Sequence, residues 1–106
     1  MLKSTMGKGF QMSFENGLTV SVQWGPGNYC KNHNAQYEQI QGRLMMLDGE
    51  CENAEVAVWR TDSGRWLRAG DFLGDDDAMD DVLGWLSADQ VVDLLVAVKN
   101  YDPSKT

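Results

Sequence analysis

The chain has 106 residues, of which 42% are apolar and 24% are charged, and it contains four tryptophans. This composition is that of a globular protein, and the length fits a single domain, residues 1–106, that buries roughly two thirds of its unfolded surface. Sixteen acidic residues against nine Lys and Arg give a formal net charge of −7. Because such a charge repels nucleic acid and anionic membranes, we expect neither as a direct partner. An acidic surface instead suits a partner protein with a basic surface, toward which it could imitate nucleic acid.

The first residues lack the apolar stretch of a secretory signal, and no run of about 18 apolar residues occurs anywhere in the chain. We therefore expect a cytoplasmic protein that does not span a membrane, with residues 1–8 as a flexible N-terminus. Cys30 and Cys51 are expected to be free thiols, because a reducing compartment disfavours a disulfide.

The clearest pattern runs from Phe10 to Trp24, where apolar and polar residues alternate on both sides of Asn16 and Gly17. Such alternation predicts two strands that share one apolar face. An Asn-Gly pair suits a two-residue type I′ turn. The sequence therefore predicts a β-hairpin with that turn.

Alternating residues before the turn formers at 61–64 predict a second hairpin. Pairing Arg60 with Arg65 places Trp59 opposite Trp66, on the face away from the valines of the same strand. We expect this outward aromatic pair to contact a partner, and a homodimer is one way to cover it.

A capping-box pattern at Ser87 and Gln90 precedes apolar residues at helical spacing, which predicts a helix from about Ala88 to Asn100. Together with the two hairpins, it predicts an α+β fold. We expect an antiparallel sheet of about four strands with the C-terminal helix packed on one face. The segment 35–47 fits either a helix or a strand.

Residues 25–34 are rich in glycine, asparagine and other turn formers, which predicts a loop. Its Asn28, Tyr29, Asn32 and His33 side chains suit hydrogen bonding to a small polar ligand and stacking on it. The alternative is an ordinary surface turn in which the asparagines supply the backbone geometry.

Arg60 and Arg65 adjoin Trp59 and Trp66 in an otherwise acidic chain. Guanidinium groups beside indoles can grip a phosphate or stack on a base, so a nucleotide-like ligand is one expected partner. The alternative is that these arginines pair with nearby acids and cover aromatic surface with their stems.

Six aspartates crowd residues 70–84, and their mutual repulsion predicts a solvated loop. Asp75, Asp76 and Asp77 suit a basic groove on a partner protein. Calcium is the alternative, although the spacing of these acids is not that of an EF-hand.

Cys30 and His33 are three residues apart, a spacing that can bring a thiol near an imidazole, and Cys51 would add a third zinc ligand. Neither an orienting third group nor a second pair of ligands accompanies them, so no catalytic or metal motif is complete. We therefore expect a binding protein without a cofactor rather than an enzyme. A thiol or zinc-dependent hydrolase is the remaining alternative.

The segment from Gly7 to Cys30 reads GKGFQMSFENGLTVSVQWGPGNYC. It resembles small uncharacterised proteins of bacteriophages and bacteria, and Gly84-Trp85 adds a weaker likeness. The resemblance implies a phage origin, a place in the host cytosol and a counter-defence role. Such a protein blocks a host immune protein or, in the alternative, sequesters a small nucleotide-like signal.

Overall fold

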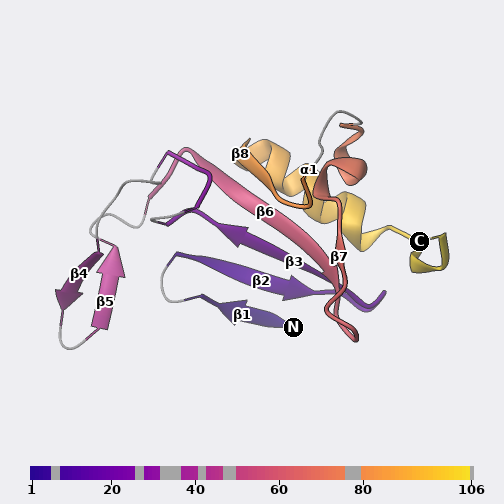
Figure 1. Cartoon of the computed structure of the whole chain (residues 1–106), viewed down its shortest axis with the longest axis horizontal. Helices are drawn as coiled ribbons and strands as arrows, with labels where there is room; N and C mark the ends of the chain where they lie inside the picture. Colours follow the sequence, from indigo (N-terminus) through magenta and orange to yellow (C-terminus); the bar gives the residue numbers. More distant parts are fainter. Residues whose placement is uncertain are drawn as a thin grey trace.

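The computed structural model describes residues 1–5, 8–25, 28–31, 37–40, 43–46, 50–75 and 80–105, with the side chains of 37–40, 43–46 and 105 left aside. Within these residues an antiparallel sheet of six strands carries one C-terminal helix on one face (Figure 1). The predicted α+β class is confirmed. No helix among the described residues is long and apolar enough to cross a membrane.

The strands of the large sheet pair in the order β1-β2-β3-β6-β7, and β8 pairs with β6 as well. Its strands are β1 (Leu2–Ser4), β2 (Gly9–Ser13), β3 (Leu18–Gln23), β6 (Asn53–Arg60), β7 (Trp66–Leu67) and β8 (Leu83–Ser87). The sheet exceeds the expected four strands because β1 and β8 form where the sequence predicted a flexible N-terminus and a solvated loop.

The first hairpin, β2 and β3, has the predicted apolar face. Phe10 pairs with Val22 and Met12 pairs with Val20, so the apolar residues of both strands point to the same side. The ring of Phe10 also contacts Trp24 edge-on, with 6.2 Å between the ring centroids. This face packs under the helix and forms much of the core.

The turn of this hairpin differs from the predicted type I′ turn. The Gly17 amide donates to the Phe14 carbonyl (3.0 Å), and the Phe14 amide donates to the Leu18 carbonyl (2.8 Å). Gly17 has a φ of 86°, whereas Asn16 has a negative φ, so the loop holds three residues and ends in a glycine bulge. A two-residue turn would have paired Phe14 with Thr19 and placed the two apolar sets on opposite faces.

The second hairpin, β6 and β7, has the predicted register. Trp59 pairs with Trp66, and the Arg60 amide donates to the Arg65 carbonyl (2.9 Å). The valines of β6 point into the core, so the two tryptophans lie on the other face of the sheet, as expected.

Helix α1 (Ala88–Lys99) begins with the predicted capping box. The Gln90 amide donates to the Ser87 hydroxyl oxygen (3.2 Å), and the Ser87 amide donates to the Gln90 side-chain oxygen (2.9 Å). Leu94 and Val98 are fully buried against the sheet. The buried core consists of Leu18, Val20, Val22, Ala54, Val56, Val58, Ala69, Leu86, Leu94 and Val98.

The predicted aspartate-rich loop contains a short 3₁₀ helix, η1 (Ala69–Leu73), which lies against α1. Its Phe72 ring meets Tyr101 edge-on at 5.0 Å between centroids. Repulsion among the aspartates therefore keeps only part of this segment in a solvated loop. The apolar residues at its start pack against the core instead, because burial of apolar surface is favourable.

Asn16 joins the first hairpin to the end of the helix. Its side-chain amide donates to the carbonyl oxygens of Val98 (2.7 Å) and Tyr101 (3.0 Å), and its carbonyl oxygen accepts from the Leu18 amide (3.2 Å). The last carbonyls of a helix have no partner within the helix. Asn16, which precedes Val98 by 82 positions in the chain, supplies a hydrogen-bond donor to the Val98 carbonyl oxygen.

The segment that fitted either a helix or a strand forms strands. β4 (Tyr37–Ile40) and β5 (Arg43–Met46) pair as an antiparallel hairpin. In Figure 1 this hairpin stands apart from the six-stranded sheet, beyond the beginning of β6.

Candidate functional site

The face of the sheet opposite α1 carries the predicted tryptophan pair. The rings of Trp59 and Trp66 lie 5.5 Å apart between centroids at an interplanar angle of 32°, and 48% of the Trp66 surface is exposed. Within the described part of the chain no α-helix covers this face (Figure 1). Exposed large aromatic side chains of this kind are typical of the contact surfaces of binding proteins.

Two further aromatic residues belong to the same face. Tyr29 is 57% exposed and Trp85 is 58% exposed, and the Trp85 amide donates to the Tyr29 carbonyl (2.9 Å). The Tyr29 amide in turn donates to the Glu55 carboxylate (2.7 Å), which alternation along β6 places on the same face as Trp59. We call Tyr29, Trp59, Trp66 and Trp85 the aromatic surface.

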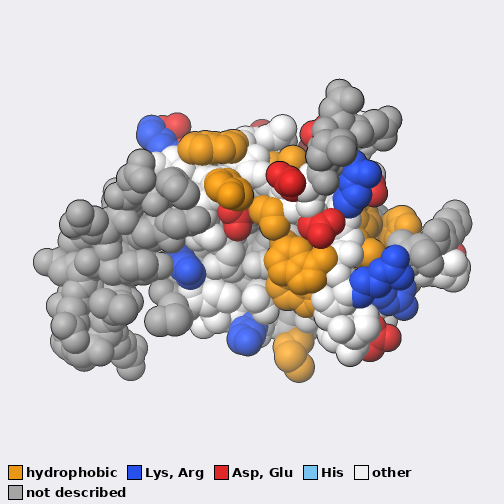
Figure 2. All heavy atoms as spheres, in the orientation of Figure 1, with side chains coloured by type: hydrophobic (Ala, Val, Ile, Leu, Met, Phe, Trp, Pro, Cys, Tyr) orange, Lys and Arg blue, Asp and Glu red, His pale blue; other side chains and the backbone are white. Residues whose placement is uncertain are grey.

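Figure 2 shows this face of the molecule. Hydrophobic side chains gather over β6 and β7 and again beside β8, with acidic side chains between and around them. Tyr29 approaches β8 closely because residue 84 is glycine: a Cβ there would lie 2.6 Å from the Tyr29 Cβ. The backbone at Gly84 thus permits the contact that brings Tyr29 and Trp85 together.

The neighbouring strands contribute hydroxyl groups to this face. Thr19, which pairs with Trp59 across the strands, shares hydrogen bonds with Ser13 (2.9 Å) and Thr61 (2.7 Å). The face therefore combines an aromatic half on β6, β7 and β8 with a polar half on β2 and β3. Protein interfaces commonly have this mixture of aromatic anchors and polar surroundings.

The loop that the sequence selected as a ligand site is held by residues at the start of β6. The side-chain amide nitrogen of Asn28 donates to the Glu55 carboxylate (3.4 Å). The side-chain oxygen of Asn28 accepts from the backbone amide of Gly25 (3.1 Å). The Lys31 amide donates to the Asn53 side chain (2.7 Å). These bonds hold Asn28 against the start of β6, whereas the side chains of Tyr29 and Lys31 are exposed to solvent.

An exposed ion pair completes this anchor. Lys31 Nζ lies 2.8 Å from the Glu52 carboxylate. The hydrogen bond and charge of Glu52 raise the pKa of Lys31, and the same contact lowers the pKa of Glu52. The predicted ligand residues Asn32 and His33 lie outside the described residues.

Cys30 is fully buried, and its thiol donates to the Gly25 carbonyl oxygen (3.7 Å). A substrate does not reach a thiol in that position, so this arrangement lends no support to a Cys30 nucleophile. Cys51 is half-buried, and both cysteines are free, as expected.

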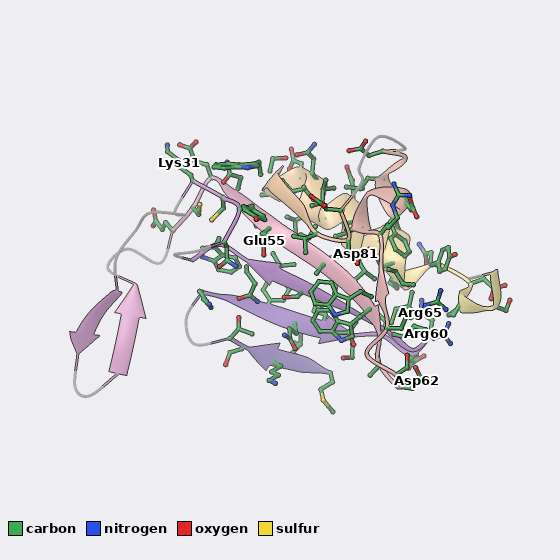
Figure 3. The ribbon with its side chains drawn as sticks, in the orientation of Figure 1. Lys31, Glu55, Arg60, Asp62, Arg65 and Asp81 are labelled. Atoms are coloured by element: carbon green, nitrogen blue, oxygen red, sulfur yellow. The ribbon has the colours of Figure 1, made fainter. Side chains whose placement is uncertain are left out.

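The structure separates the arginines from the tryptophans that the sequence grouped with them. Arg60 pairs with the buried Leu18, so alternation places Arg60 and its partner Arg65 on the opposite side of the hairpin from the indoles. Arg60 Nε lies 3.7 Å from the Asp62 carboxylate. Figure 3 shows both arginines at the turn end of β6, far along the strand from Lys31 and Glu55.

Of the aspartates predicted to contact a partner, Asp75 is exposed and its amide donates to the Gly70 carbonyl (2.9 Å). Asp76 and Asp77 lie outside the described residues. Among the residues that the structure does describe, no three His, Cys, Asp or Glu side chains cluster as metal ligands do.

Sequence reasoning missed Trp85, whose backbone is strained. It is the only described residue other than glycine with a positive φ, 61°. The pairing of β6 with β8 shifts register between Ala54 and Val56, next to this residue. No local sequence pattern predicts this register shift, because it depends on the pairing of two strands that lie about 30 residues apart in the sequence.

Trp85→Gly is expected to be more stable to urea unfolding than Trp85→Ala by about 1 kcal/mol, because glycine adopts a positive φ without the steric cost that any Cβ brings. Both variants lose the same exposed indole, so the comparison isolates the backbone. Equal stabilities, or a more stable alanine variant, would show that Trp85 is not held in a strained conformation.

No protein family, no characterised protein and no solved structure matches the chain.

Proposed function

We propose that this chain is a non-enzymatic binding protein that docks its aromatic surface on a partner protein with a basic surface. The observation that carries the proposal is the contacting pair of Trp59 and Trp66 on a sheet face that α1 leaves open. Tryptophan and tyrosine are the residues on which binding energy concentrates in protein interfaces. Strand-borne aromatic residues also lose little conformational freedom when they bind.

The charge of the chain favours a basic partner. The formal net charge is −7, and the exposed Asp80 and Asp81 precede the strand that carries Trp85. Glu55 adds a carboxylate next to Tyr29. Complementary charge of this kind accelerates encounter and selects among partners more than it adds affinity.

The resemblance to small phage proteins puts a host immune protein first among the candidate partners, with the host cytosol as the place of action. Binding would block that protein by covering a surface it needs. The exposed Asp75 adds one more carboxylate to the acidic character expected of the protein.

Two other functions receive less support. A nucleotide-like ligand held between arginine and tryptophan would need both on one face, and the register places Arg60 and Arg65 away from the indoles. A Cys30 hydrolase would need an accessible thiol, and this one is fully buried.

The proposal is tested by capture from host lysate on immobilised protein, followed by affinity measurement with the captured protein once it is purified. Trp66→Ala is expected to weaken binding at least about 30-fold, which corresponds to a central aromatic hot spot. Raising the salt concentration should slow association, because the attraction between opposite charges is screened.

The matched control is Val96→Ala, which removes an exposed apolar side chain (51% exposed) from α1 on the other side of the sheet. Binding that Val96→Ala preserves and Trp66→Ala abolishes supports the proposal. A captured protein whose affinity is the same for both variants overturns it. Native mass spectrometry distinguishes the remaining outcomes. A dimer disrupted by Trp66→Ala would make the partner a second copy, and a retained nucleotide-sized mass would favour sequestration of a nucleotide-like signal.

A further inference from the structure

A cavity of about 580 Å³ lies between α1 and the apolar face of the sheet. It is distinct from the aromatic surface, which occupies the other face. Its apolar lining consists of Phe10, Val22, Trp24, Ala54, Leu86, Ala88, Val91, Val92 and Leu95. Pockets of this size with a mainly apolar and aromatic lining are typical of small-molecule sites.

Helix packing explains why this space is open. Leu94 and Val98 fill the contact between α1 and the sheet completely, whereas Val92 projects from the helix and is 56% exposed. The first turns of α1 therefore leave apolar surface in water beside Phe10 and Trp24. Apolar surface arranged around a hollow favours an apolar occupant.

The polar part of the lining is acidic. Residues 50–53, which lead into β6, contribute Glu50, Cys51, Glu52 and Asn53, and the charged side chains among the described residues of the lining are these two glutamates. Lys31 pairs with Glu52 from outside, at a solvent-exposed position. A bound cation would share the Glu52 carboxylate with Lys31 and would lie near the Glu50 side chain.

The aromatic part of the lining suits a cation as well. Phe10 and Trp24 meet edge-on, at 6.2 Å between centroids and 68° between planes. An organic ammonium group near an indole face is attracted by the ring, and pockets for quaternary ammonium ligands use aromatic rings in this way.

We propose that this cavity binds a small organic cation, an ammonium group on an apolar body. The apolar body lies against Val91, Val92 and Leu95, and the ammonium group faces Glu50 and Glu52. An anionic amphiphile such as a fatty acid fits less well, because the glutamates repel its carboxylate and the capping box already uses the Ser87 and Gln90 amides of the helix.

Three eight-carbon probes test the proposal at physiological salt: octyltrimethylammonium, neutral 1-octanol and octanoate. Calorimetry measures affinity, and the rate at which a maleimide modifies Cys51 reports occupancy, because Cys51 lines the cavity and Cys30 is fully buried. Octyltrimethylammonium should bind with saturation, slow the modification of Cys51 and bind at least about 10-fold more tightly than octanoate, because the exposed carboxylates of Glu50 and Glu52 attract the ammonium group and repel the octanoate carboxylate.

Matched variants separate the two halves of the site. Val92→Gln should weaken octyltrimethylammonium and 1-octanol alike, whereas Val96→Gln, one helical turn away and equally exposed, should change neither. The double change Glu50→Gln and Glu52→Gln should remove the preference for the cation and leave 1-octanol binding unchanged. The double change Glu15→Gln and Asp93→Asn, at two exposed acids outside the lining, controls for the loss of two negative charges.

The proposal is overturned if octanoate binds as tightly as the cation, if Val92→Gln leaves binding intact, or if none of the probes protects Cys51. These outcomes are independent of the aromatic surface, because Trp66→Ala should bind octyltrimethylammonium like the unmodified chain. Loss of protein binding and loss of cation binding are thus distinguishable.

Discussion

Asn16→Asp is expected to lower the free energy of unfolding by about 2–4 kcal/mol at pH 7, because it removes the hydrogen-bond donor and places a negative charge at the helix C-terminus. The Asn16 amide donates to the carbonyls of Val98 and Tyr101 at 2.7 and 3.0 Å. A carboxylate at the same position faces those oxygens with no hydrogen to share.

The pH dependence of this loss has a definite sign. The carbonyl oxygens disfavour the charged form, so the pKa of the introduced carboxyl is raised in the folded state above its unfolded value. The free energy of unfolding that the protonated carboxyl group contributes is fully present below the pKa of the unfolded state. It is lost as the pH rises through the pKa of the folded state. The difference in stability between Asn16→Asp and the unmodified chain should therefore be smaller at pH 3 than at pH 7.

Urea unfolding at both pH values measures this effect. Asn100→Asp is the matched control: it adds the same charge at the exposed C-cap of the same helix without removing the bridging amide. We expect that control to cost less than about 1 kcal/mol, the size of a helix-dipole effect. Equal losses in the two variants would mean that the bridge from the hairpin to the helix contributes nothing.

Gly9→Ala is expected to lower the free energy of unfolding by about 3 kcal/mol, the upper part of the range for overpacking. A Cβ at Gly9 would lie 2.0 Å from the Val22 carbonyl oxygen and 2.9 Å from the Gln23 Cα. Both are backbone atoms of β3, so no side chain can turn aside to make room. The hairpin must open at this end instead.

Urea unfolding measures the loss, and hydrogen exchange locates it. Amides of β1 and β2 should exchange faster in Gly9→Ala, because β1 pairs only with β2 among the described strands. Gln11→Ala, on the same strand, is the control and should change stability by less than about 0.5 kcal/mol. If both variants unfold at the same urea concentration, the close approach at Gly9 is absent in solution.

Local patterns accounted for the elements whose signals are local. The alternation around Asn16 and Gly17 and that before Trp59 predicted both hairpins, and the capping box at Ser87 predicted where α1 begins. These features depend on residues a few positions apart, so the chain itself carries enough information to specify them. The outward Trp59 and Trp66 pair follows from the same alternation.

Features that depend on distant contacts were not predictable in this way. β1 and β8 are short and become strands only because β2 and β6 offer free edges to pair with. The exposure of Trp85 depends on a register shift against β6. The separation of Arg60 and Arg65 from the indoles, by contrast, follows from local alternation, because neighbouring residues of a strand point to opposite faces.

The amino-acid pattern thus specified the α+β class, the two hairpins, the capped helix and the acidic surface, because each is set by composition or by near neighbours. Tertiary contacts made a turn asparagine into a cap for the helix, assembled the aromatic surface from three segments and left a cavity beside α1. The physical reason is that side-chain partners 30 to 80 positions away are chosen by packing and by the satisfaction of buried polar groups, which no short window of sequence contains.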